Sequence, residues 1–105
     1  MANNLSFTIS DLAKQDIENT LQYISEELKN EKAARDLYAK IKEAFALILQ
    51  YPAAQPQSSL VIPNNPYDLR KMPIRNYMLY YGITLSEITV LRFIYGGRNI
   101  DERFF

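Results

Sequence analysis

The chain has 105 residues, of which 48% are hydrophobic, and its 12 basic side chains balance its 12 acidic ones. A chain of this size and composition predicts one globular domain over residues 1–105, with its own core and no room for a second domain. It contains no cysteine and no histidine, which excludes disulfides, thiolate metal sites, ordinary zinc chemistry, and cysteine or serine–histidine nucleophiles.

The N-terminal sequence and the hydropathy pattern indicate where the protein acts. No apolar run approaches the roughly 18 residues of a membrane helix. Residues 1–10 lack the basic start and the long apolar region of a secretory signal, and the lack of cysteine fits a reducing compartment. We therefore expect a cytoplasmic protein without membrane contact, metal or cofactor.

The first half of the chain predicts a strand followed by two helices. Residues 5–9 alternate as in a short strand, after which Ser10 or Asp11 can cap a helix. Asn30 can cap a second helix, which should end before Pro52 because proline lacks the amide of the helical ladder. Each helix carries an apolar stripe: Leu12, Ala13, Ile17, Leu21, Ile24 and Leu28 in the first, and Ala33, Ala34, Leu37, Tyr38, Ile41, Ala44, Phe45, Ile48 and Leu49 in the second. The short turn between them predicts an antiparallel helical hairpin.

The second half predicts an ordered loop and three strands. Residues 52–66 hold four prolines and should run over the body, with residues 60–62 against the core or at a sheet edge. A strand over residues 68–74 is expected to bulge or end at Pro73. Residues 77–83 and 88–95 predict a central antiparallel hairpin whose second strand is covered on both faces. Alternation places Tyr77, Leu79, Tyr81 and Ile83 on one side of the first of these strands, and Met78 and Tyr80 on the other.

The order of these elements defines a fold class. A Gly96-Gly97 pair ends the last strand and leaves a short tail over residues 98–105. The order β-α-α-β-β-β predicts an α+β fold in which an N-terminal strand and an antiparallel helical hairpin pack on a small, mostly antiparallel sheet.

The charge is unevenly distributed along the chain. Residues 1–68 hold six basic against nine acidic side chains, whereas residues 69–105 hold six basic against three acidic ones, and five of those six are arginines. The cations could converge on RNA phosphates, with aromatic side chains as stacking surfaces: the cations are Arg70, Lys71, Arg75, Arg92 and Arg98, with Asn76 beside them, and the aromatics are Tyr77, Tyr80, Tyr81, Tyr95 and Phe104. The alternative is that these aromatics are core residues and the arginines keep the sheet edge soluble.

Two segments carry a family resemblance. LRKMPIRNY at residues 69–77 runs into Tyr80-Tyr81, and VLRFIYGGRNI occupies residues 90–100. With the order of elements, Ala33-Ala34 opening the second helix and LQYP closing it, these segments resemble the RelE/ParE superfamily, the toxins of bacterial type II toxin–antitoxin systems. The resemblance covers essentially the whole chain.

The resemblance implies two alternative activities. RelE-like members cut mRNA in the ribosomal A site without a metal, using basic side chains that stabilise the charged phosphorane. ParE-like members inhibit DNA gyrase and lack that set. By resemblance, Lys71 and Arg98 fall on two catalytic positions and are the candidate catalytic residues. The other three positions fall on Leu69, Met78 and Phe104.

The resemblance therefore implies a bacterial toxin of an addiction or plasmid-stabilisation module that inhibits growth. ParE-like binding to gyrase is favoured over RelE-like endoribonuclease action, and a non-toxic binding module is a third alternative. The candidate target-binding or nucleic-acid-binding residues are Arg70, Arg75, Asn76, Arg92 and Phe104. A cognate antitoxin is expected to lay an extended or helical segment over an apolar patch, with acidic residues meeting Arg70, Arg75 and Arg98.

Overall fold

A computed structural model describes residues 5–60, 62 and 64–105, and it contains a four-stranded sheet and two helices. The elements in chain order are β1 (Ser6–Ile9), α1 (Asp11–Gln22), a π-helical turn (Tyr23–Glu27), α2 (Glu31–Gln50), β2 (Asp68–Ile74), β3 (Tyr77–Ile83), β4 (Glu87–Tyr95) and a 3₁₀ turn (Glu102–Phe104). No helix in these residues is both long and apolar enough to cross a membrane.

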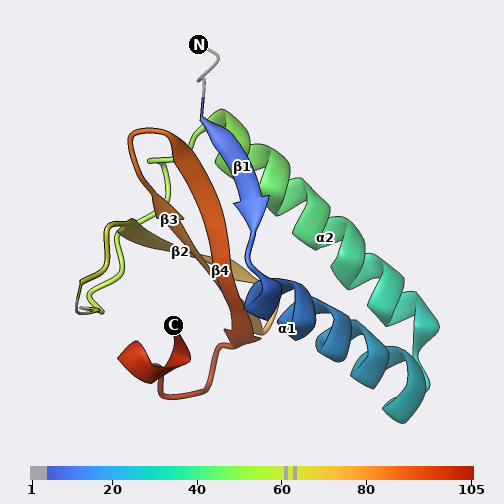
Figure 1. The fold of residues 1–105 in the computed structure, drawn as a ribbon. Helices are drawn as coiled ribbons and strands as arrows, with labels where there is room; N and C mark the ends of the chain where they lie inside the picture. Colours follow the sequence, from blue (N-terminus) through green and yellow to red (C-terminus); the bar gives the residue numbers. More distant parts are fainter. Residues whose placement is uncertain (1–4, 61, 63) are drawn as a thin grey trace.

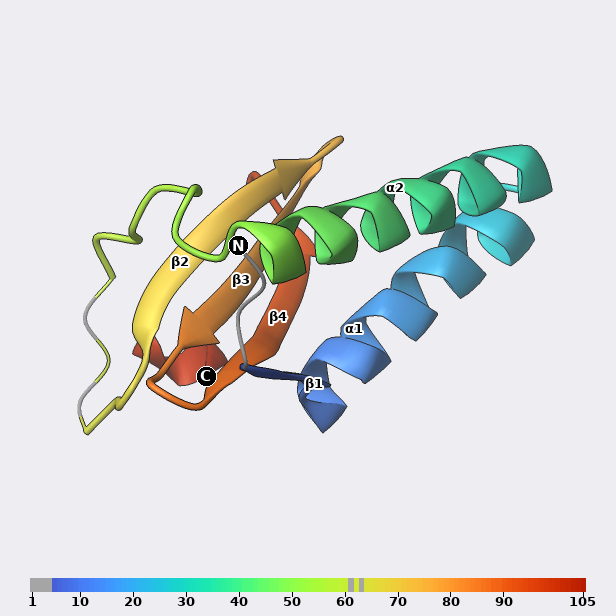
Figure 2. The ribbon, with the colours of Figure 1, turned by 90° about the horizontal axis from the view of Figure 1, so that it is seen from above.

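The sheet has the strand order β1-β4-β3-β2, with β1 parallel to β4 and the other neighbours antiparallel. The helical hairpin lies on one side of the sheet, and the loop after α2 and the C-terminal tail lie toward the other (Figure 1, Figure 2). The predicted α+β architecture is confirmed, including the central hairpin of β3 and β4.

Two polar side chains begin the helices as the sequence predicts. The Oγ of Ser10 accepts from the amide of Ala13 at 3.0 Å, and the Oδ1 of Asn30 accepts from the amide of Ala33 at 3.0 Å. The Ser10 hydroxyl also donates to the carbonyl of Leu91 at 3.0 Å, so this cap ties the start of α1 to β4. Helix α2 ends at Gln50, two residues before Pro52.

The apolar stripes of the two helices are narrower than predicted. Leu12 and Leu28 of the first segment, and Tyr38 and Leu49 of α2, are about half exposed. Each α-helical residue is rotated by about 100° from its neighbour, so Leu12, Tyr38 and Leu49 fall on the flanks of faces centred on the buried Ala13, Leu37 and Ile48. Leu28 lies outside because the π-helical turn, in which the Leu28 amide donates to the Tyr23 carbonyl, changes the helical phase.

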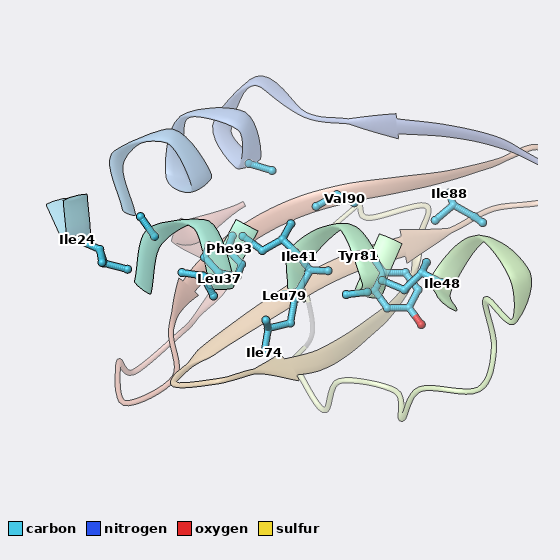
Figure 3. Packing of buried hydrophobic residues seen from close by; sticks show 13 residues of the cluster. Ile24, Leu37, Ile41, Ile48, Ile74, Leu79, Tyr81, Ile88, Val90 and Phe93 are labelled. Atoms are coloured by element: carbon cyan, nitrogen blue, oxygen red, sulfur yellow. The ribbon is translucent and has the colours of Figure 1, made fainter. Parts of the chain in front are cut away.

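The main core lies between the hairpin and the sheet (Figure 3). Its buried members come from both helices, the π-helical turn and three strands: Ala13, Ile24, Ala34, Leu37, Ile41, Ala44, Ile48, Ile74, Leu79, Tyr81, Ile88, Val90 and Phe93. Leu79 pairs with Phe93 and Tyr81 pairs with Val90 across the sheet, so the alternation predicted for β3 is confirmed.

Tyr81 makes the stability of the fold sensitive to alkaline pH. Its hydroxyl donates to the carbonyl of Pro52 at 2.7 Å, and burial raises its pKa to about 12. The folded state therefore favours the protonated phenol, and this contribution is complete below pH ~10 and lost as the pH rises toward 12. We expect the free energy of unfolding to fall by about 2 kcal/mol over that interval.

Urea unfolding at several pH values between 8 and 12 measures this loss. In Tyr81→Phe the decline should be shallower; some slope should remain because burial also raises the pKa of Tyr77 and Tyr80. Equal slopes in the two proteins would contradict the assignment.

The helix-free face of the sheet is largely covered. Tyr80 is only 8% exposed, and the ring of Phe105 lies edge-on to it with 5.4 Å between centroids. Tyr67, at the end of the loop, lies directly over Gly82. On the same face, Thr89 and Ile94 of β4 are 8% and 3% exposed, so β4 is covered on both faces, as predicted. The hypothesis of Tyr80 and Tyr81 as stacking surfaces for bases is wrong because both side chains are core residues.

The loop before β2 pairs with the outer edge of that strand. The Ser58 amide donates to the Leu69 carbonyl at 2.8 Å, and the Lys71 amide donates to the Pro56 carbonyl at 3.3 Å. The predicted ordered loop is therefore confirmed where it is described; Ile62 is half-buried, and Val61 lies outside the described residues.

β2 passes through Pro73 without a register shift, so the expected bulge is absent. Amides two residues apart in a strand point to the same side. The nitrogen of Pro73 therefore faces outward, like the Lys71 amide, where the sheet needs no donor.

Candidate functional site

Arg92 and Asp16 form the polar centre of the β4 exit. The guanidinium Nε and Nη2 of Arg92 donate to the two carboxylate oxygens of Asp16 at 2.7 and 2.9 Å. This bidentate contact raises the pKa of Arg92. The pairing of β1 ends at Ile9, opposite Val90, and beyond it the Phe93 amide donates to Asp16 at 3.0 Å. Asp16 thus replaces the missing strand partner at this edge of β4.

Phe104 joins two arginines. Arg92 also donates from Nη1 to the carbonyl oxygen of Phe104 at 2.6 Å. The guanidinium carbons of Arg92 and Arg98 lie 5.8 and 5.0 Å from the centroid of the Phe104 ring, within the range of cation–π attraction. The structure therefore brings together three of the predicted residues, one from β4, one from its exit and one from the tail.

Arg98 opens onto a groove between α1 and the end of β4. We call this the Arg98 groove, a depression of about 420 Å³ lined by Asp16, Asn19, Thr20, Tyr23, Tyr77, Phe93, Ile94, Tyr95 and Arg98. Tyr23 and Tyr95 are 52% and 54% exposed, while Tyr77 stacks on Phe93 with 5.0 Å between ring centroids. Arg98 is exposed and forms no ion pair within the described part of the chain.

The remaining cations do not converge on this groove. Arg70 pairs with Asp68 at 2.9 Å and donates to the carbonyls of Ala53 and Gln55. Its guanidinium therefore fastens the loop to β2, and with only 15% of its side chain exposed it is a poor ligand for a target. Arg75 is exposed in the β2–β3 turn at the far end of that strand.

Lys71 and Asn76 lie on neighbouring parts of the sheet. Lys71 pairs in register with Tyr80, and Tyr80 pairs with Arg92, so the three share the helix-free face with Lys71 and Arg92 about 10 Å apart at Cα. Lys71 is half-buried and does not line the Arg98 groove. Asn76 contacts the end of β4 through its backbone: its carbonyl accepts a hydrogen bond from the Gly96 amide at 2.8 Å.

Sequence reasoning missed the contributions of Asp16 and Tyr23. Asp16 lies three residues after the buried Ala13 and beside the half-buried Ile17. A carboxylate at that helical spacing must face the protein body, where it needs a cation or amide partner. No comparable signal identifies Tyr23, since its position follows from the π-helical turn. The described residues contain no group of three potential metal-binding side chains among His, Cys, Asp and Glu.

A helical hairpin on a mixed four-stranded sheet, with arginines at the exit of the last strand, agrees with the fold expected for a small toxin of the RelE/ParE superfamily, and a family model supports that class. The chain belongs to the ParE toxin family: the family described as "ParE toxin of type II toxin-antitoxin system, parDE" matches residues 7–100.

A solved structure described as the "Chromosomal ParDE TA system from P. aeruginosa" is similar in fold. The TM-score is 0.70 at 15% identity, and the match covers 88% of this chain and 96% of that one. At this identity the similarity concerns the fold alone. No curated protein matches the sequence at a significant level.

Proposed function

We propose that this chain is the toxin of a type II toxin–antitoxin pair, and that it arrests bacterial growth in the cytoplasm by binding DNA gyrase through the Arg98 groove. The observation that carries the proposal is that exposed Tyr23 and Tyr95 line the same groove as Arg98, which forms no ion pair among the described residues. Tyrosine and arginine are enriched among the residues that dominate protein–protein binding energy. Membership of the ParE family supports a protein target.

Cleavage of mRNA is the alternative, favoured by one observation. Lys71, Tyr80 and Arg92 form a row on the helix-free face, which places two cations and a phenol across three strands. However, the Arg92 charge is compensated by Asp16, and Tyr80 is covered by Phe105. The preorganised positive charge that phosphoryl chemistry requires is therefore weak on this face.

The antitoxin is proposed to cover two depressions that carry exposed arginines. One is the Arg98 groove. The other is a depression of about 250 Å³ between α2 and β2, where Leu47, Met72 and Pro73 lie beside Arg75. The expected acidic contact to Arg70 is not part of this proposal, because Asp68 already pairs with that side chain.

The Arg98→Ala variant tests the role of the groove. We expect it to weaken inhibition of purified gyrase about 10- to 30-fold, the loss typical of an interface hot spot, and to relieve growth arrest on expression without an antitoxin. The matched control is Arg35→Ala, which removes an arginine from the exposed surface of α2 and should leave both readouts unchanged. Supercoiling assays across a toxin titration measure the effect.

The other functions give different outcomes in the same experiments. Ribosomal mRNA cleavage that is abolished by Lys71→Ala, with gyrase unaffected, would establish the nuclease and reject the proposal. Normal growth of cells that express the chain well would reject both toxic activities and favour the non-toxic binding module.

A further inference from the structure

Asp16 and three residues of the C-terminal segment form a continuous chain of contacts. They run from Asp16 on α1 to Arg92 on β4, then to Phe104 in the tail and finally to Arg98 at the strand exit. We propose that Asp16 is a positioning residue that sets the position of Arg98 through Arg92 and Phe104. The consequence for target binding rests on the proposed function; the coupling itself does not.

The first contact fixes the plane of the Arg92 guanidinium. Two parallel N–H···O bonds of 2.7 and 2.9 Å define the orientation of both groups. The pair is well shielded, with 15% and 16% of the Arg92 and Asp16 side chains exposed. The Asp16 carboxylate is itself held by the Phe93 amide at 3.0 Å, so its position is tied to the β4 backbone.

The second contact docks the tail. With two nitrogens engaged by Asp16, Arg92 directs Nη1 to the Phe104 carbonyl at 2.6 Å. The tail also contacts the sheet through Phe105 on Tyr80. Within the tail the Phe104 amide donates to the Asp101 carbonyl at 3.1 Å, and at its start the Arg98 amide donates to the Tyr95 carbonyl of β4 at 3.2 Å. Rotation of the Arg92 plane would therefore release one of the anchors of residues 98–105.

The third contact places Arg98. β4 ends at Tyr95, and the two glycines that follow impose little backbone restriction. A Cβ at Gly97 would lie 2.8 Å from Cε2 of the exposed Tyr95 ring, so a larger residue there would make that ring turn aside. The Phe104 ring, 5.0 Å from the Arg98 guanidinium carbon, then supplies the side-chain contact that holds this cation at the groove.

Asp16 also lines the groove, so direct contact with the target is the competing explanation. The two explanations differ in the unbound protein. If Asp16 acts through Arg92 and Phe104, its loss must loosen the tail before any target is present. If it only touches the target, the tail stays docked.

The experiment compares Asp16→Asn, Arg92→Lys and Phe104→Leu in the full chain with Glu18→Gln, a matched change of one acid on an exposed position of α1. Amide exchange of Phe104 and Arg98, followed by NMR in the free protein, reports tail docking. Gyrase supercoiling reports target binding, and thermal unfolding confirms that each variant is folded.

We expect Asp16→Asn and Arg92→Lys to speed exchange at Phe104 about tenfold and to weaken gyrase inhibition by a similar factor, as for loss of one charge-assisted contact. Phe104→Leu keeps the carbonyl contact but removes the ring, so it should weaken inhibition with less change in exchange. Glu18→Gln should match the wild type in both.

Weaker inhibition by Asp16→Asn with unchanged exchange at Phe104 would overturn the inference and identify Asp16 as a direct target contact. Unchanged exchange and inhibition together would also overturn it. If the wild type fails to inhibit gyrase, the proposed function fails, while the exchange measurements alone still support or overturn the coupling. If Asp16→Asn does not fold, Arg92→Lys and Phe104→Leu decide in the same way.

Discussion

The Gly82→Ala variant is expected to lose about 3 kcal/mol of unfolding free energy, because the added methyl group has no space. A Cβ at Gly82 would lie 2.5 Å from both Cβ and Cγ of Tyr67 and 2.6 Å from its Cδ1. These atoms are close to the Tyr67 backbone, so the ring cannot move aside by a simple rotation. The effect is a large fraction of the ~5–15 kcal/mol that stabilises a typical domain. Urea unfolding followed by circular dichroism measures it.

A double-mutant cycle assigns that loss to the contact with Tyr67. In a Tyr67→Gly background, which removes the Cβ as well as the ring, Gly82→Ala should cost less than about 1 kcal/mol. Tyr67→Ala is not a sufficient control because its Cβ would still lie 2.5 Å away. An equal cost in both backgrounds would show that the strain comes from elsewhere in β3.

The second large effect is expected from Ile48→Ala, compared with Leu49→Ala at the next position of α2. Ile48 is 1% exposed and belongs to the core, whereas Leu49 is 45% exposed. Truncating Ile48 should cost about 2–5 kcal/mol, because it loses buried apolar area and leaves a cavity, and truncating Leu49 less than about 1 kcal/mol.

Urea unfolding of both variants measures the difference, and their similar loss of volume makes them a matched pair. Comparable costs would mean that α2 is rotated about its axis relative to the sheet, with Leu49 on the buried face.

The fold could be predicted because local signals in this sequence agree with one another. Ser10 and Asn30 mark the helix starts, Pro52 marks the end of α2, and the alternation in residues 77–83 assigns the two faces of β3. Each of these signals depends on residues a few positions apart, and such residues are also close together in space.

The widths of the helical stripes and the cover on the helix-free face could not be predicted. Whether Leu12 or Leu49 is buried depends on the angle at which a helix meets the sheet, which periodicity does not specify. The cover is made by Tyr67 and Phe105, which lie in segments without regular periodicity. Composition marks such segments as a loop and a tail but does not show which surface they contact.

The candidate site was predicted in part, because charge counts identify cations but not their partners. Arg92 and Arg98 come together at Phe104 since β4 and its exit bring them there. The partner of Arg92 is an aspartate 76 residues earlier, and no local spacing encodes a pair so distant. For the same reason the use of Arg70 to fasten the loop after α2 was not foreseen.

The outer edge of β2 has a consequence for solubility. An exposed edge strand offers backbone groups on which a second molecule can build intermolecular sheet. Here residues 56–58 already occupy the outward groups of Leu69 and Lys71, and Pro73 has no hydrogen to offer. A chain with zero net charge lacks the long-range repulsion that keeps many proteins dispersed. The covered edge therefore protects the protein against aggregation. We expect a variant with a shortened loop to precipitate more readily than the wild type.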